Sequence, residues 1–315
     1  MTMARKKIDI AIPDLQGKLA VVTGASDGLG LEIARRLAIA GSEVILPVRN
    51  PKKGQAAMAR IAESAPFAKV STRPLDLASL QSVADLAALL LKEARPIDIW
   101  INNAGVMIPP TRYLSTDGFE LQFATNFLGH YALVGRVLPL LKVSKARVTS
   151  MSSLGSRNGE INFADLQSEK KYKPWPAYNQ SKLALTLWAR ELERRSTLDG
   201  WGVVSNVAHP GLTVTNLQGS GPNMGRNSES AMSRVFPWVG RHFPSLVQQP
   251  ATGALPALYA ATSPDAKGDT FYGPSGPGHL TGAPAEQAYY KTAENMPEAK
   301  QVWGVAETLT DVVYR

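Results

Sequence analysis

The chain has 315 residues and a formal net charge of +8, with 44% hydrophobic and 19% charged residues, which is a globular composition. It contains no cysteine, which excludes disulfides, cysteine-ligated zinc and thiol catalysis. No apolar stretch reaches the length of a membrane span or signal peptide, so we expect a cytoplasmic protein, and the scattered lysines and arginines favour a solvated basic surface over nucleic-acid binding.

The first two-thirds of the chain alternates between strand-like and helix-like segments. Short apolar runs predict strands at 19–23, 43–48, 70–75, 97–101, 147–151 and 203–208, with a last strand within 270–283. The helical spacing of apolar residues predicts helices at 29–40, 51–64, 79–94, 117–141 and 177–196. This alternation predicts an α/β fold with a doubly wound parallel sheet, which binds ligands beyond the carboxyl ends of its strands.

A glycine-rich turn, Thr23-Gly24-Ala25-Ser26-Asp27-Gly28-Leu29-Gly30, joins the first predicted strand to the first predicted helix. Glycines let the backbone approach a pyrophosphate, and the start of a helix offers free N–H groups and a positive dipole end. The spacing differs from the commoner Gly-x-Gly-x-x-Gly, and an ordinary strand–helix turn is the alternative. Its place after the first strand favours a dinucleotide site.

Two further strand ends carry polar candidates. Arg49 follows the second predicted strand, where an acidic residue would bind the ribose of NAD and an arginine can bind the 2′-phosphate of NADP. Arg49 therefore favours NADP(H), with NAD(H) as the alternative, unless it is an ordinary surface residue. Asp76-Leu77 closes the third strand, where Asp76 could reach an adenine or, equally, cap a helix.

Tyr178 and Lys182 lie near the start of a predicted helix, four residues apart and therefore on one face. A free tyrosine has a pKa of about 10, too high for proton exchange at neutral pH. A nearby ammonium favours the phenolate and lowers that pKa, so the pair can act as a general acid/base.

A serine and an asparagine complete the candidates. Ser152-Ser153 ends the fifth predicted strand, where a hydroxyl could donate to a substrate oxygen or merely cap a turn. Asn126 lies within an otherwise apolar helix, so its buried amide needs a partner, either a structural one or a water in a proton path.

These motifs occur in one order along the chain, and together they resemble the short-chain dehydrogenase/reductase family over about residues 15–215. The resemblance rests on these motifs: Thr23-Gly24-(x)3-Gly28-x-Gly30, Asn102-Asn103-Ala104-Gly105, Asn126, Ser153, Tyr178-(x)3-Lys182 and Pro210-Gly211-(x)3-Thr215. It implies a Rossmann-type, seven-stranded parallel sheet in a single domain spanning residues 1–315. The cofactor half would be about 15–150, and the catalytic and substrate part about 151–315.

The resemblance also implies a role for each catalytic residue. Tyr178 would protonate the substrate oxygen during reduction, and Lys182 would hold the nicotinamide ribose and lower the tyrosine pKa. Ser153, preferred over Ser152, would orient the carbonyl, and Asn126 would hold a water that reloads the proton relay. The implied cofactor contacts are Thr23, Gly24, Ser26, Asp27, Gly28, Leu29, Gly30, Arg49, Asp76, Leu77, Asn103, Ala104, Gly105, Tyr178, Lys182, Pro210, Gly211, Thr213 and Thr215.

Two further features are similar to one branch of the family, the retinol dehydrogenases and WW-domain oxidoreductases. One is the segment Asp165–Tyr172 together with the long spacing of 25 residues (178 − 153) between Ser153 and Tyr178. The other is Asn126-Phe127-Leu128-Gly129-His130. Members of this branch use lipophilic alcohols and aldehydes, often with NADP(H). The chain looks more like its soluble bacterial proteins, because no N-terminal anchor is visible.

Several residues outside these motifs keep two interpretations. His130 and His209 could be catalytic, although packed or capping histidines are favoured, and no cluster of metal ligands is visible. The segment 216–250 could be a variable lid, in which Met224, Met232, Phe236, Trp238 and Phe243 supply an apolar face, or a helix packed on the sheet.

An active oxidoreductase acting on a small-molecule alcohol/carbonyl pair is the leading function. A non-catalytic NADP(H)-binding regulator is the main alternative, and nucleic-acid binding is the weakest. The resemblance also implies a homodimer or homotetramer formed through the helices at 117–141 and 177–196.

Overall fold

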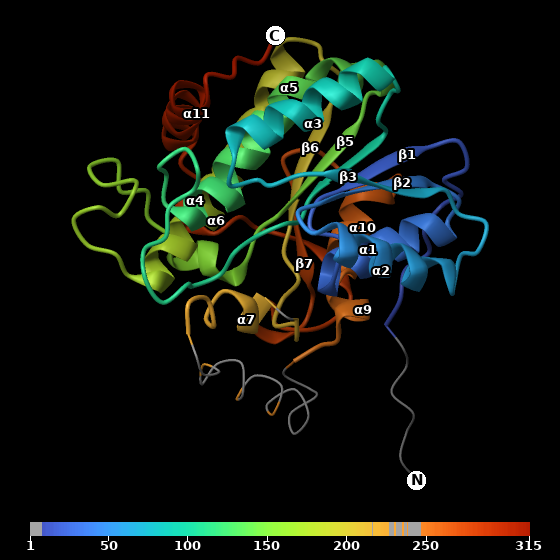
Figure 1. The fold of residues 1–315 in the computed structure, drawn as a ribbon, viewed down its shortest axis with the longest axis horizontal. Coiled ribbons are helices and arrows are strands. Elements are labelled where there is room, and N and C mark those ends of the chain that lie inside the picture. The colour runs from blue at the N-terminus through green and yellow to red at the C-terminus, as the bar shows by residue number, and fades with distance from the viewer. Residues whose placement is uncertain (1–7, 216, 227–229, 231–234, 236–237, 239–246) are drawn as a thin grey trace.

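The computed structural model describes residues 8–215, 217–226, 230, 235, 238 and 247–315. A single eight-stranded sheet with the order β3-β2-β1-β4-β5-β6-β7-β8 forms its centre. The strands are β1 Leu19–Val22, β2 Glu43–Val48, β3 Val70–Pro74, β4 Ile99–Asn102, β5 Arg147–Met151, β6 Val204–Ala208, β7 Phe271–Pro274 and β8 Pro284–Gln287. The first seven are parallel, which confirms the doubly wound Rossmann-type fold (Figure 1).

The eighth strand is a correction to the expected count of seven. β8 pairs with β7 in the antiparallel direction and lies at the edge of the sheet. Its sequence, Pro-Ala-Glu-Gln, is short, begins with proline and has no apolar run, because an edge strand needs no burial on both sides. The apolar pattern that revealed the parallel strands is therefore missing.

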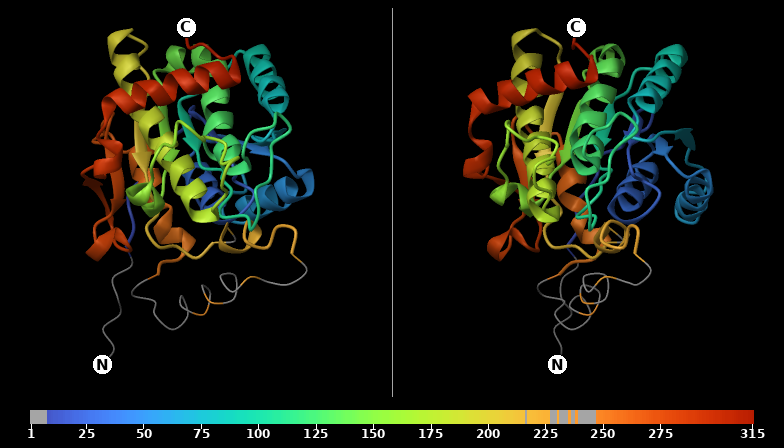
Figure 2. Two further views of the ribbon diagram at one scale, coloured as in Figure 1. Left: turned by 90° about the vertical axis from the view of Figure 1, so that its left-hand side faces the viewer. Right: turned by 60° about the vertical axis from the view of Figure 1, so that its left-hand side comes forward.

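Helices cover both faces of the sheet (Figures 1 and 2). Their bounds are α1 Gly28–Ile39, α2 Pro51–Ala62, α3 Leu80–Glu93, α4 Leu121–Phe123, α5 Gly129–Ser144, α6 Pro174–Leu198, α7 Leu217–Ser220, α9 Pro250–Gly253, α10 Leu255–Thr262 and α11 Met296–Thr310. One buried core lies between the sheet and α3, α5, α6 and α11, and the other between the sheet and α1, α2 and α10. No helix within the described ranges is long and apolar enough to cross a membrane.

The helix expected at 117–141 is interrupted. It begins at Leu121, where the Glu120 carboxylate accepts a hydrogen bond from the Phe123 N–H, and it ends at Ser144. Between α4 and α5 the chain forms a π-helix, Ala124–Leu128. Such π segments often occur at functional sites, and this one contains Asn126.

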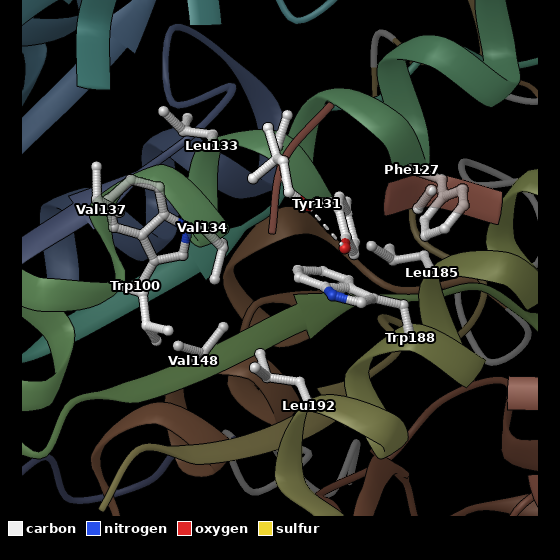
Figure 3. Close-up of a cluster of buried hydrophobic side chains, with 14 of the residues drawn as sticks. Trp100, Phe127, Tyr131, Leu133, Val134, Val137, Val148, Leu185, Trp188 and Leu192 are labelled. Atoms are coloured by element: carbon white, nitrogen blue, oxygen red, sulfur yellow. Dashed lines mark hydrogen bonds between the residues drawn. The ribbon is translucent and has the colours of Figure 1, made fainter. Parts of the chain in front are cut away.

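The α11 helix, which was not among the predicted helices, packs on α6 and α5 around an aromatic cluster. The cluster centres on Tyr131 of α5, which meets Trp188 of α6 edge to face (Figure 3) and contacts Trp303 of α11 in the same way. The Tyr131 hydroxyl donates to the Val312 carbonyl, and the Tyr314 hydroxyl donates to the Tyr131 carbonyl. The C-terminus therefore covers part of the two helices expected at a subunit interface.

Candidate active site

A cavity of about 490 Å³ lies at the carboxyl ends of the strands, where the order of the sheet reverses between β1 and β4. Its wall contains every residue expected to contact the cofactor except Thr23. Ser153 also lines the cavity, whereas Asn126 does not. Wall residues that the sequence motifs missed include Lys53, Met107, Thr125, Trp175, Leu212 and Leu217.

The glycine-rich turn packs directly against the loop after β4. Gly24 has a φ of +65°, and a Cβ there would lie 2.7 Å from the Ala104 Cα, so both the conformation and the space require glycine. Asp27 caps α1 by accepting a hydrogen bond from the Gly28 N–H at 2.8 Å. The remaining N–H groups and the positive end of the α1 dipole face the cavity, an arrangement suited to a phosphate.

Thr23 lies behind the cavity wall rather than in it. Its hydroxyl oxygen accepts hydrogen bonds from the backbone N–H groups of Asn103 and Ala104, at 3.0 and 3.1 Å. The Asn103 amide in turn donates to the Thr23 carbonyl at 2.9 Å. Thr23 therefore joins the ends of β1 and β4.

Basic side chains border the cavity after β2. Arg49 is exposed at the rim, and Lys53 lies in the first turn of α2, which Asn50 caps through the Lys53 N–H. Lys53 could have been found from the sequence, because it follows Arg49 by four residues at the start of a predicted helix. Both cations are placed to bind a phosphate group.

Asp76 lines the cavity and closes a turn of its own. Its carboxylate accepts a hydrogen bond from the Ala78 N–H at 3.0 Å. The side chain that caps α3 is Ser79, which accepts from the Ser82 N–H. The alternative that Asp76 caps the following helix is therefore wrong.

Asn126 has a structural partner in the loop after β4. Its amide oxygen accepts from the Val106 N–H at 2.7 Å, and its amide nitrogen donates to the Val106 carbonyl and to the Ser181 hydroxyl, both at 2.9 Å. This pairing ties the loop at 103–106 to the π-helix and to α6. Asn126 therefore holds one wall of the cavity in register with the helix that carries Tyr178.

The serine, tyrosine and lysine candidates converge at one point of the wall. Lys182 is buried, and its ammonium donates to the Met151 carbonyl at 2.8 Å. Burial lowers the pKa of Lys182 to about 8. Burial raises the pKa of Tyr178, and a hydrogen bond with Ser153 opposes this in part. This rise in the pKa of Tyr178 is opposite to the lowering expected from a neighbouring ammonium, because desolvation of the phenolate dominates.

The two neighbouring serines have different surroundings. The Ser152 hydroxyl pairs with the Thr186 and Ser156 hydroxyls, at 2.8 and 3.2 Å. The Ser153 hydroxyl lies beside the Tyr178 phenol and accepts from the Gly155 N–H. This geometry favours Ser153 over Ser152 as the residue that would face a substrate oxygen.

The two candidate histidines are both buried and hydrogen-bonded. His130 Nε2 contacts the Thr23 hydroxyl at 3.1 Å, and burial lowers the pKa of His130 to about 3. His209 Nε2 contacts Gln287 at 2.9 Å, and burial lowers the pKa of His209 to about 4. Both imidazoles are therefore neutral at physiological pH, which fits the interpretation of packed residues. The described parts of the chain hold no group of three or more potential metal ligands.

The cavity has two unlike ends. At the polar end, which we define as Gly24, Gly28, Arg49, Lys53 and Asp76, backbone and charged groups line the wall. The apolar end consists of Met107, Trp175 and Leu217, of which Met107 and Leu217 belong to a small hydrophobic cluster with Tyr178.

The segment 217–226 packs against the apolar end through Leu217 and Gly221. A Cβ on Gly221 would overlap the Met107 carbonyl, and the Tyr113 hydroxyl donates to the Met224 carbonyl at 3.2 Å. Of the other aromatic and methionine residues expected in a lid, Trp238 is exposed. Met232, Phe236 and Phe243 lie outside the described residues.

The comparisons with known proteins agree with this geometry. The family model described as short chain dehydrogenase matches residues 18–224. Retinol dehydrogenase 13 from Homo sapiens is 40% identical over 252 residues, which are 79% of this chain and 73% of the relative.

Two solved structures are similar as well. An uncharacterised protein from Mycobacterium paratuberculosis has a TM-score of 0.75 and 35% identity, covering 96% of this chain and 97% of the other. The 3-oxoacyl (acyl-carrier-protein) reductase from Agrobacterium tumefaciens C58, solved with NADP bound, has a TM-score of 0.59 and 26% identity, covering 79% and 88%.

Proposed function

The chain belongs to the short-chain dehydrogenase/reductase family, and from this membership we propose that it is an NADP(H)-dependent enzyme that interconverts a lipophilic alcohol and its carbonyl, with Tyr178 as general acid/base. The family and its dehydrogenase relatives make the chain an NAD(P)-dependent oxidoreductase that acts on alcohols or carbonyls. The observation that carries the finer proposal is one continuous cavity, in which Ser153, Tyr178 and Lys182 lie between a polar end and an apolar end.

The polar end fits a dinucleotide. The start of α1 offers free N–H groups and the positive end of a helix dipole to a pyrophosphate. Arg49 and Lys53 supply positive charge at the rim where a ribose 2′-phosphate would lie. The reductase from Agrobacterium tumefaciens, solved with NADP, supports the same preference. In this proposal the residues at 15–150 form the cofactor half, with Thr213 and Thr215 completing its far side.

Each catalytic group has one task in the proposed reaction. The nicotinamide supplies or accepts the hydride. Tyr178 gives its proton to the carbonyl oxygen during reduction, and its raised pKa keeps that proton in place at neutral pH. Ser153 donates a hydrogen bond to the same oxygen as negative charge develops on it. Lys182 holds the ribose hydroxyls, and Asn126 positions the loop at 103–106 and a water for the proton relay.

The substrate proposal rests on the apolar end and on the relatives. Met107, Trp175 and Leu217 border the space in front of Tyr178. The similarity to retinol dehydrogenase 13 supports an apolar alcohol or aldehyde. A homodimer or homotetramer remains part of the proposal, and it would use the surface of α5 and α6 that α11 leaves free.

The test is turnover of a panel of aldehydes and ketones, followed through the absorbance of NADPH. Tyr178→Phe should lower kcat by about a thousandfold, since general acid catalysis contributes 10²–10⁴-fold, and should leave the Kd of NADPH within twofold. Tyr259→Phe is the matched control, because Tyr259 packs against Tyr272 in the core on the other side of the sheet. Undiminished turnover by Tyr178→Phe would refute the proposed acid, and tight NADPH binding without any turnover would favour a regulator.

A further inference from the structure

Trp175 is an aromatic residue of the cavity wall, and none of the family motifs assigns it a role. It lies in the first turn of α6, three residues before Tyr178, so the helix places both side chains on adjoining positions of one face. The two ring centroids are 6.2 Å apart, and the rings stand at 83°, an edge-to-face contact. The Trp175 side chain is 49% exposed although it is large and apolar. Half of the indole surface is therefore free next to the proposed proton donor.

The wall around Trp175 differs in charge from the rest of the cavity. Within the described part of the wall, the charged residues are Asp27, Arg49, Lys53, Asp76 and Lys182. The first four belong to the turn and rims after β1, β2 and β3, and Lys182 is buried with its ammonium on Met151. At the apolar end, Met107 and Leu217 lie beside Tyr178 with no charged side chain of the described wall among them. This part of the wall therefore favours an uncharged, apolar group against Trp175.

We propose that Trp175 is a specificity-determining residue that stacks on a flat, unsaturated group adjoining the reacting carbonyl. This inference rests on the proposed function of the same cavity. A planar aromatic or conjugated carbonyl compound can cover the free indole face while its oxygen meets Tyr178 and Ser153. A saturated chain of equal size covers the same face less completely, and it loses more torsional freedom when it binds. The enzyme then prefers planar carbonyl compounds over saturated ones of similar length.

The experiment compares cinnamaldehyde with 3-phenylpropanal, two aldehydes that differ by one carbon–carbon double bond next to the carbonyl. In the unaltered enzyme kcat/KM should be higher for cinnamaldehyde. Trp175→Ala should lower the cinnamaldehyde/3-phenylpropanal ratio by about three- to tenfold, the range typical of one aromatic contact, mainly through KM. Trp175→Phe keeps a ring and should retain most of the ratio. The Kd of NADPH reports on folding and on the polar end of each variant.

Phe67→Ala is the matched control. Phe67 is 98% exposed between α2 and β3, at the end of the sheet opposite the cavity, so its loss should change neither aldehyde's kcat/KM. An unchanged ratio in Trp175→Ala, with turnover intact, would overturn the inference while leaving the proposed function standing.

Failure of the proposed function has a different signature. If the unaltered enzyme binds NADPH but reduces none of the aldehydes, calorimetric titration of cinnamaldehyde into the NADPH complex still tests Trp175. A Kd that rises three- to tenfold in Trp175→Ala would support the stacking site without the reaction. Equal Kd values, or no binding to the unaltered enzyme, would refute it.

Discussion

The two ends of the cavity are built in different ways. The polar end comes from the turns that follow β1, β2 and β3, three consecutive strands of the chain. Hydrogen bonds between backbone and side-chain groups of Thr23 and Asn103 hold the first of these turns. The apolar end brings together Met107, Trp175 and Leu217, which belong to three separate segments and whose side chains pack around Tyr178.

The comparison indicates where the site tolerates change. A wall made of backbone has few ways to adjust. A single carbon added to a glycine of that wall therefore displaces the neighbouring turns. A wall made of side chains can repack, so substitution there should alter selectivity before it alters folding. The predictions below test this difference, beginning with the largest expected effect.

Gly24→Ala should damage the polar end most. The added Cβ would lie 2.7 Å from the Ala104 Cα at a φ of +65°, so the turn must shift. We expect a loss of about 1–2 kcal/mol in the free energy of unfolding and a more than tenfold rise in the Kd of NADPH.

Gly118→Ala is the control for this substitution. Gly118 has a φ of +84° with nothing within 4 Å of an added Cβ, so it carries the backbone strain without the collision. Urea titration and NADPH fluorescence measure both quantities. Equal effects of the two substitutions on NADPH binding would contradict the close approach as the cause.

Binding of NADPH should weaken by about tenfold as the pH rises through about 8, the value to which burial lowers the pKa of Lys182. Above this pH the amine is neutral and loses a charge-assisted hydrogen bond to the ribose. The measurement is the Kd of NADPH against pH in Tyr178→Phe, which removes the titration of the tyrosine. A Kd that stays flat between pH 7 and about 9.5 would show that Lys182 does not hold the ribose.

The same shift in the pKa of Lys182 predicts the sign of a stability change. The folded chain binds this proton more weakly than the unfolded chain, in which the lysine has its ordinary pKa of 10.5. The free energy of unfolding contributed by Lys182 should therefore increase as the pH rises from about 8 towards 10.5. Urea titrations of the unaltered protein and of Lys182→Met would isolate this contribution, and parallel pH profiles would contradict it.

Gly221→Ala should affect the apolar end and spare the polar end. The added Cβ would overlap the Met107 carbonyl, so the segment 217–226 must move away from the wall. We expect kcat/KM for the aldehydes to fall by about five- to tenfold, the equivalent of about 1 kcal/mol, with the Kd of NADPH unchanged. A parallel loss of NADPH binding would mean that the two ends are not separable.

Arg49→Ala should have the smallest effect, because the side chain is exposed and its charge is screened by salt. We expect the Kd of NADPH to rise about fivefold at low ionic strength and the Kd of NADH to stay constant. Lys53→Ala should behave in the same way if both cations bind the 2′-phosphate. Equal losses of affinity for NADPH and NADH would remove the argument that Arg49 gives a preference for NADP(H).

The sequence by itself predicted the parts of the fold that carry a local signal. The strands at 43–48 and 147–151 have the predicted bounds. In the first of them residues 44–48 are apolar along their length, as expected of a strand buried on both faces. The glycine-rich turn was visible for a similar reason, since only glycine suits the conformation and spacing that Gly24 requires. The choice of Ser153 over Ser152 depended on the family resemblance, and the geometry supports it.

The tertiary structure decided what depends on distant parts of the chain meeting. The polar edge strand β8 shows no pattern that distinguishes it until β7 is in place. The helix α11 does have a local signal that the prediction missed, namely the Asn295 cap and the helical spacing of Ala299, Val302 and Ala306. Thr23 lies behind the cavity wall and not in it, because its hydroxyl accepts hydrogen bonds from the loop after β4. The rise in the pKa of Tyr178 likewise follows from burial, which the spacing of residues along a helix does not reveal. Neighbouring residues determine caps, turns and strand patterns, whereas burial and cavity shape arise only when separate segments pack together.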